Sequence, residues 1–106
     1  MSEVKLVVLY PQPTDVAQFE IDYPAHISLL HEKMNIPTDH KPYTVTKFDS
    51  QPQNPSPFYQ MFSMPFPSAE ALQQTLESAE MQEVAGDATR ISTGGAPVIL
   101  TGSDAK

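Results

Sequence analysis

The sequence predicts a single α+β domain whose strands and helices follow the order β-α-β-β-α-β. Short runs rich in β-branched and aromatic residues alternate with longer segments of helical periodicity, and proline-rich loops separate them. The chain has 106 residues, of which 40% are apolar and 18% charged, and this is enough for one ordinary globular core. Residues 1–106 are therefore expected to form one domain.

Two elements are expected in the first part of the chain. Residues 4–10 form a β-branched run that suits a central strand covered on both faces. Residues 15–34 carry apolar side chains at three- and four-residue steps, which indicates an amphipathic helix with Thr14 as its N-cap. Because Pro24 removes a backbone donor inside this segment, the helix is expected to kink or restart near Tyr23.

The second part of the chain predicts three strands and another helix. Residues 43–49 and 58–66 are the second and third strands, and Ser68 is placed to cap a second helix. Gly86 is a natural terminator of that helix, while Ser78 is able to cap a new turn, so its end stays open between residues 78 and 90. Residues 96–101 form the fourth strand, and residues 102–106 are expected to be a flexible polar tail.

Two right-handed β-α-β crossovers interleaved in one antiparallel sheet make a ferredoxin-like split sandwich, with both helices on the same face. The other face of the sheet is also apolar, because Val7 and Leu9 alternate with Leu6 and Val8 along the first strand. The chain is too short to provide another layer over that face. A homodimer that packs sheet against sheet is therefore predicted.

The composition argues against several kinds of partner and cofactor. Thirteen acidic against six basic residues give a net charge of −7, which disfavours nucleic acid and anionic membrane surfaces. No segment reads as a signal peptide or a membrane span, so a cytoplasmic location is expected. The sequence has no cysteine, and Asn35 stands where a zincin helix starting at His31 would need its second histidine. Neither a metal nor another cofactor is expected.

Three stretches of the sequence point to a known family. They are the strand of residues 4–10, the helix of residues 19–30 with its Tyr23 and His26, and the run of residues 68–100, which includes the Thr93-Gly94-Gly95 turn before the last strand. Together these stretches resemble the ethyl tert-butyl ether degradation (EthD) family over most of the chain. The resemblance implies a dimeric α/β barrel, and it connects the chain with the catabolism of small organic compounds.

The candidate site is centred on His26, which lies on the shoulder of the apolar stripe of the first helix. An imidazole there faces partly inward, where it can move a proton or orient a polar group of a ligand. Tyr23 shares its helix face and is the second candidate catalytic residue. Phe19, Tyr10 and Tyr43 are candidate pocket residues that supply apolar surface. The alternative is that His26 is a buried histidine bonded to backbone and that the aromatic residues only pack the core.

These observations predict a small enzyme or enzyme accessory in the catabolism of a small, largely apolar organic compound, with His26 as proton shuttle or ligand anchor. The alternative is a dimeric module that binds a ligand or docks on another protein without catalysis. Whether the protein is an enzyme is left open, because no nucleophile or metal motif decides it.

Overall fold

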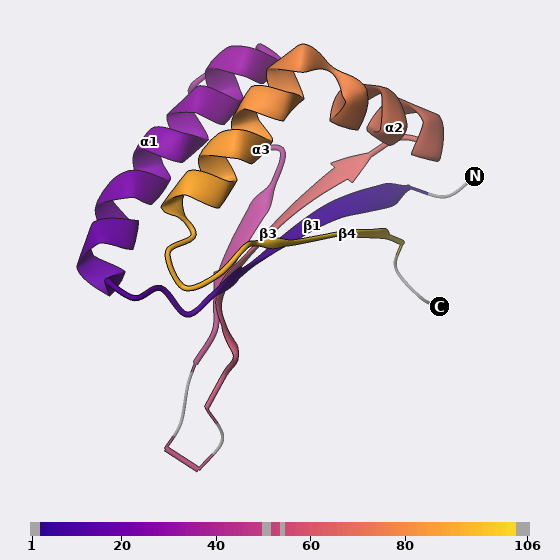
Figure 1. Ribbon diagram of the computed structural model, residues 1–106. Helices are drawn as coiled ribbons and strands as arrows, with labels where there is room; N and C mark the ends of the chain where they lie inside the picture. The colour runs from indigo at the N-terminus through magenta and orange to yellow at the C-terminus, as the bar shows by residue number, and fades with distance from the viewer. Residues whose placement is uncertain (1–2, 50–51, 54, 104–106) are drawn as a thin grey trace.

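The computed structural model describes residues 3–49, 52–53 and 55–103. One antiparallel sheet has the strand order β2-β3-β1-β4, and the helices lie on one of its faces (Figure 1). This is the predicted ferredoxin-like arrangement, and the α+β fold class is confirmed. The elements in chain order are β1 (Val4–Pro11), α1 (Val16–Met34), β2 (Thr44–Lys47), β3 (Phe58–Phe66), α2 (Ala69–Glu77), α3 (Ala79–Ile91) and β4 (Val98–Gly102).

Strand β1 is central, as its apolar run predicts, and it pairs antiparallel with β3 on one side and β4 on the other. Its side chains alternate, so that Leu6, Val8 and Tyr10 are buried under the helices while Val7 and Leu9 are half-buried on the opposite face. The core lies between the helices and the sheet. Its buried apolar members are Leu6, Val8, Tyr10, Phe19, Leu30, Phe62, Met64, Phe66, Leu72, Met81, Val84, Ala88 and Ile91.

Helix α1 begins one residue later than expected, because Asp15 and not Thr14 is its N-cap. The Asp15 side chain accepts a hydrogen bond from the Gln18 amide, whereas the Thr14 amide donates to the Thr93 hydroxyl. The helix then runs through Pro24 to Met34, so the predicted restart near Tyr23 is wrong. Burial of the apolar face of α1 against the sheet and α3 offsets the backbone hydrogen bond that a proline removes.

The second helical segment breaks at Ser78. This residue has an extended backbone (φ −71°, ψ 150°), and its hydroxyl accepts from the Met81 amide, so that it ends α2 and caps α3. Gly86 does not terminate the helix, and α3 continues to Ile91. Packing of the buried apolar face of α3 outweighs the cost of about 1 kcal/mol for a glycine inside a helix.

The remaining boundaries differ from expectation by a few residues. Strand β2 covers only Thr44–Lys47 of the predicted residues 43–49, and β4 covers Val98–Gly102 in place of 96–101. Gly102, expected as the first residue of the tail, pairs with Lys5 as the last residue of β4. The rest of the predicted tail includes residues 104–106, which lie outside the described residues.

The helix-free face of the sheet is apolar around Val7 and Leu9, as predicted, although Lys5 and Ser63 lie on the same face. In the described part of the chain all three helices lie on the other side (Figure 1). Val98 and Leu100, which pair with Leu9 and Val7, bring further aliphatic side chains to this face and are 36% and 49% exposed. We call the face made by Val7, Leu9, Val98 and Leu100 the open face.

The Thr93-Gly94-Gly95 turn closes one end of the domain by packing on the segment between β1 and α1. A Cβ atom placed on Gly94 would lie 1.7 Å from the backbone oxygen of Gln12, a separation that no real contact allows. Gly95 has a φ of 141°, which also favours glycine. The two glycines therefore allow the α3–β4 connection to lie directly on the entry to α1.

We predict that Gly94→Ala lowers the free energy of unfolding by roughly 1–3 kcal/mol, the range typical of overpacking. Gly86→Ala is the matched control. No atom lies within 4 Å of the Cβ position at Gly86, which is exposed inside α3. Its substitution should raise stability by up to about 1 kcal/mol. Urea unfolding of both variants measures the difference, and equal effects would contradict the packing of this turn.

Candidate functional site

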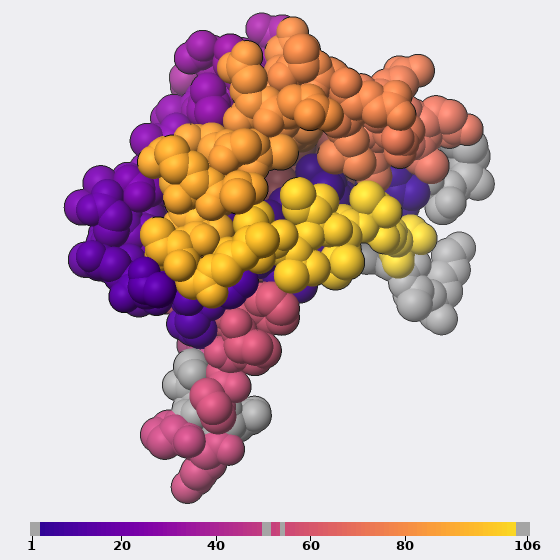
Figure 2. All heavy atoms as spheres, viewed as in Figure 1, coloured from indigo at the N-terminus to yellow at the C-terminus, as the bar shows by residue number. Residues whose placement is uncertain are grey.

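A cavity of about 50 Å³ lies between the helices and the sheet. It exceeds the roughly 10–15 Å³ that one water molecule requires, so it has room for a small chemical group. Figure 2 shows the surface hollowed between α2 and α3 on one side and β4 on the other, with β1 visible at the bottom. The lining is almost wholly apolar and consists of Leu6, Val8, Tyr10, His26, Leu30, Phe62, Leu76, Met81, Val84, Ala85, Ala88 and Ile99.

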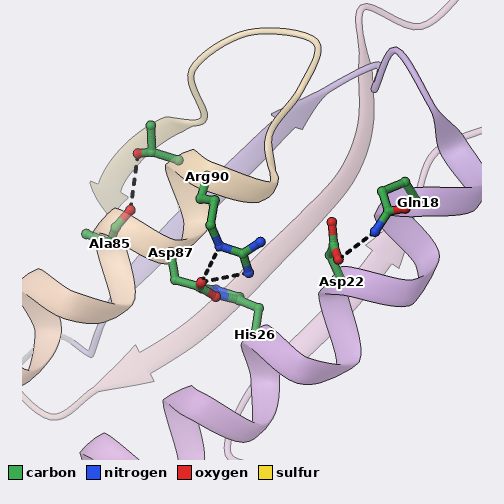
Figure 3. A network of polar contacts seen from close by, with 7 residues as sticks. Gln18, Asp22, His26, Ala85, Asp87 and Arg90 are labelled. Carbon is green, nitrogen blue, oxygen red and sulfur yellow. Dashed lines mark hydrogen bonds and ion pairs between the residues drawn. The ribbon is translucent and has the colours of Figure 1, made fainter.

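His26 is the one titratable group besides Tyr10 in the described lining of this cavity. It projects from α1 toward α3, and its side chain is only 6% exposed. Its Nδ1 atom lies 2.9 Å from Oδ2 of Asp87, a residue of α3 (Figure 3). The prediction that His26 faces inward is therefore correct, and its hydrogen-bond partner is a carboxylate and not the backbone.

Asp87 is in turn held by Arg90, one turn later on α3. The guanidinium Nε and Nη2 atoms lie 2.9 and 2.8 Å from Oδ1 of Asp87, as Figure 3 shows. Each carboxylate oxygen thus has a partner of its own: Oδ1 has Arg90 and Oδ2 has His26. This arrangement fixes the carboxylate, and through it the plane of the imidazole.

The charges in this group follow from burial and from these contacts. Burial lowers the pKa of His26 below its ordinary value, although the Asp87 carboxylate opposes the shift. Burial alone would raise the pKa of Asp87, but hydrogen bonds from His26 and Arg90 outweigh it and the pKa is lowered. At neutral pH the imidazole is therefore neutral and the carboxylate ionised. Since a carboxylate can only accept, Nδ1 carries the proton and Nε2 keeps a lone pair.

Tyr10 is the second polar group of the lining. It is 2% exposed, and burial raises the pKa of its hydroxyl above the ordinary range, with the neighbouring Tyr23 and Asp87 adding to the shift. Tyr10 therefore keeps its proton at every physiological pH. The predicted assignment of Tyr10 to a pocket agrees with its position.

Phe19 and Tyr23 lie behind the cavity and not in its described lining. Their rings stack with centroids 5.5 Å apart, and the Tyr23 ring lies 5.9 Å from that of His26. Burial raises the pKa of Tyr23, and its hydroxyl makes no hydrogen bond of normal geometry within the described residues. Tyr59 also packs edge-on against Phe19, so it faces α1 and not the open face. These rings support His26 from the core side.

Tyr43 is not in the described lining of the cavity, although its ring lies 5.2 Å from that of the lining residue Phe62, and its hydroxyl contacts a second histidine. Its hydroxyl lies 2.6 Å from Nε2 of His31, while Nδ1 of His31 faces the backbone oxygens of Ile36 and Pro37 at 3.3 and 3.1 Å. This contact ties the end of α1 to the start of β2. The architectural role that the sequence left open for His26, a buried histidine bonded to backbone, therefore belongs to His31.

Asp87 is the residue that the sequence interpretation missed. It lies three residues after Val84 and four before Ile91, both buried, so a charged side chain stands on the apolar stripe of its helix. Such a residue requires a partner when the stripe is buried. That signal was present in the sequence, but the identity of the partner, 61 positions away, was not.

The described residues offer neither a cluster of metal ligands nor a membrane-spanning helix. Within them, no group of three or more His, Asp or Glu side chains is arranged to hold a metal ion. No described helix is both long and apolar enough to cross a bilayer.

Several solved structures are similar to this chain. An EthD family protein from Bacillus halodurans C-125 shares 28% identity, with a TM-score of 0.79 and coverage of 97% of this chain and 99% of that one. Hydroxynitrile lyase from Passiflora edulis shares 14% identity, with a TM-score of 0.73 and coverage of 99% and 95%. A dimeric ferredoxin-like protein of unknown function from Jannaschia sp. CCS1 shares 13%, with a TM-score of 0.66 and coverage of 95% and 97%.

No protein-family model matches the chain, and no curated protein sequence does. The fold nevertheless defines the class, because these similarities extend over nearly the whole length of each chain. The chain has the ferredoxin-like fold. Within that fold, the chain is similar to an EthD family protein over nearly its whole length, which bears out the resemblance inferred from the sequence.

We predict that Asp87→Asn lowers the pKa of His26 further, because the carboxylate that opposes the effect of burial is gone while Arg90 remains. In the parent protein the folded pKa already lies below the ordinary 6.5. The unfolded chain then binds more protons, so stability falls as the pH drops through about 6.5 toward the folded value. NMR titration of the His26 ring in both proteins measures the shift, and an unchanged or higher pKa in the variant would contradict the assignment.

Proposed function

We propose that this protein binds a small, largely apolar organic molecule in the cavity and acts on it as an enzyme or enzyme accessory in its catabolism. The observation that carries the proposal is the position of His26, a neutral imidazole held by Asp87 at the edge of an apolar cavity. A histidine in this state can accept a proton from a bound molecule and return it. In the proposed role it is a proton shuttle or a ligand anchor.

The chemistry of the cavity supports a ligand with a mainly apolar body. Aliphatic and aromatic side chains make nearly all of its lining, so the part of a bound molecule that enters the cavity would exchange water for apolar contact. Only His26 and Tyr10 offer polar groups there. Tyr23 takes part indirectly, because its ring packs beside that of His26 and limits how the imidazole can turn.

The proposed assembly is a homodimer that covers the open face. The apolar side chains of that face remain half-buried or exposed in a single chain, and soluble proteins rarely leave such a surface in water. The similar structure from Jannaschia is described as dimeric, which supports this proposal.

A non-catalytic binding or docking module is the second candidate. The same cavity would then hold a ligand without turnover, and His26 would only orient it. Fold alone does not decide between the two, since the same scaffold serves different functions. Conversion of a bound molecule, followed by mass spectrometry, would distinguish them.

We predict that His26→Ala weakens binding of small aromatic ligands that hydrogen-bond to the imidazole by about three- to tenfold, the ratio expected from one net hydrogen bond, and leaves the melting temperature within a few degrees of the parent. The variant removes one polar contact, and Arg90 continues to hold Asp87, which is itself 18% exposed. His31→Ala is the matched control on the same helix. It should destabilise by about 1–3 kcal/mol, because the buried partners of the ring lose their hydrogen bonds.

Calorimetry with a screen of small aromatic compounds and thermal unfolding together test this pair of variants. An unchanged affinity for hydrogen-bonding ligands in His26→Ala would contradict the proposed site. Loss of binding in folded His31→Ala would show that the assay reports helix integrity and not the cavity.

We predict that Leu100→Lys gives a monomer in light scattering, whereas the parent protein is a dimer. A lysine on the open face places a hydrated charge in an apolar interface. Ile21→Lys is the control, since Ile21 is an aliphatic residue of α1 that is 68% exposed and lies on the helix side. It should stay dimeric, and a monomeric parent protein would remove the proposed interface.

A further inference from the structure

The arrangement of His26 restricts which ligands the cavity can hold, and this deduction rests on the proposed function. We propose that the cavity selects neutral molecules that carry a hydroxyl group on an apolar body, and that Asp87 sets this selectivity by presenting the Nε2 lone pair of His26. Asp87 is then a positioning residue, because it acts through His26 and has no place in the described lining.

The hydrogen bond between His26 and Asp87 can run in only one direction. The ionised Asp87 side chain offers only acceptor oxygens, and one of them lies 2.9 Å from Nδ1. The proton of the neutral ring is therefore on Nδ1, and the nitrogen left for a ligand is an acceptor. An acceptor in an apolar cavity binds a molecule that donates.

The Nε2 lone pair disfavours ligands that can only accept hydrogen bonds. The oxygen of an ether or a ketone has lone pairs but no hydrogen to donate, so it would face the Nε2 lone pair without a bond and would lose its hydration on entry. A hydroxyl group donates to Nε2 and so replaces the hydrogen bond that its hydrogen made to water, which an ether or ketone cannot do. Among apolar molecules of the same size, the alcohol or phenol is therefore preferred.

The groups around the cavity also restrict the charge of the ligand. No Lys or Arg belongs to the described lining of the cavity. Arg90 influences the pKa of His26, but its guanidinium is already bound to Asp87. A carboxylate ligand would lose its hydration without gaining a counter-ion, and it would approach the negative Asp87. Anionic ligands are therefore disfavoured.

The groups around His26 also determine how this selectivity changes with pH. They are Asp87 and Arg90 on α3, Tyr23 on α1 and Tyr10 on β1, and the tyrosine hydroxyls remain protonated. Only His26 itself changes charge as the solution becomes mildly acidic. Once it is protonated, Nε2 donates, and the preference for a hydroxyl ligand disappears.

The experiment measures binding of phenol, anisole, toluene and benzoate to the full-length protein near neutral pH. Phenol should bind about three- to tenfold more tightly than anisole or toluene, which is the ratio expected from one net hydrogen bond, and benzoate should bind most weakly. Nitrogen-15 shifts of His26 should report a proton on Nδ1 and a lone pair on Nε2. At a pH below the pKa of His26, the preference of phenol over anisole should be lost.

In Asp87→Ala no carboxylate holds the ring proton on Nδ1, so the neutral ring can carry it on Nε2. Phenol should then lose its advantage over anisole, while toluene affinity stays the same. Asp22→Ala is the control, since it removes a carboxylate from α1 whose side chain accepts from Gln18. It should keep the parent's order of affinities.

The outcomes separate this inference from the proposed function. Anisole or benzoate binding as tightly as phenol, or a proton found on Nε2, overturns the selectivity but leaves an apolar binding site. If none of the four compounds binds, both the proposed function and the selectivity are overturned. Should Asp87→Ala fail to fold, the ligand series and the nitrogen shifts of the parent protein still decide.

Discussion

The hydrogen bond between His26 and Asp87 is the contact on which the properties of the cavity depend. It joins α1 and α3, which also meet through apolar side chains and through the ion pair of Lys33 with Glu83, and it places a polar pair inside the packed layer. Each partner would be costly there alone, because a buried imidazole and a carboxylate both lose hydration. Together with Arg90 they satisfy each other, so the polar pair can be kept where a ligand would reach it.

Two histidines of α1 illustrate how position on one helix separates two roles. His26 and His31 are both buried, and both have a bonded Nδ1 atom. The ring of His31 has partners at both nitrogens, including the Tyr43 hydroxyl, so neither nitrogen is left to contact a ligand. The ring of His26 has one carboxylate partner and borders a cavity, so its second nitrogen remains available for chemistry.

Much of the fold could be predicted because it is encoded in local patterns. The apolar run of β1 indicated a central strand, and the periodicity of α1 indicated its buried face, including the inward position of His26. The end of the second helix could not be decided locally, because burial of α3 against the sheet overrides the preference of Gly86. The same holds for the aromatic residues: Tyr10 of the central strand lines the cavity, whereas Tyr43, next to β2, bonds to His31, and only the tertiary structure distinguishes them. The pairing of Asp87 with His26 also arises only from the packing of α1 on α3.

Strand β4 belongs to two environments at once. Because side chains alternate along a strand, Ile99 lies in the cavity lining while its neighbours Val98 and Leu100 lie on the open face. The strand is an edge of the sheet held by β1 alone among the described strands, so its position is less constrained than that of the centre. A displacement of Ile99 by a bound molecule would therefore also move its neighbours on the surface proposed to join two chains. If that movement changes self-association, thermodynamic reciprocity requires self-association and occupancy of the cavity to change each other's equilibrium by the same factor.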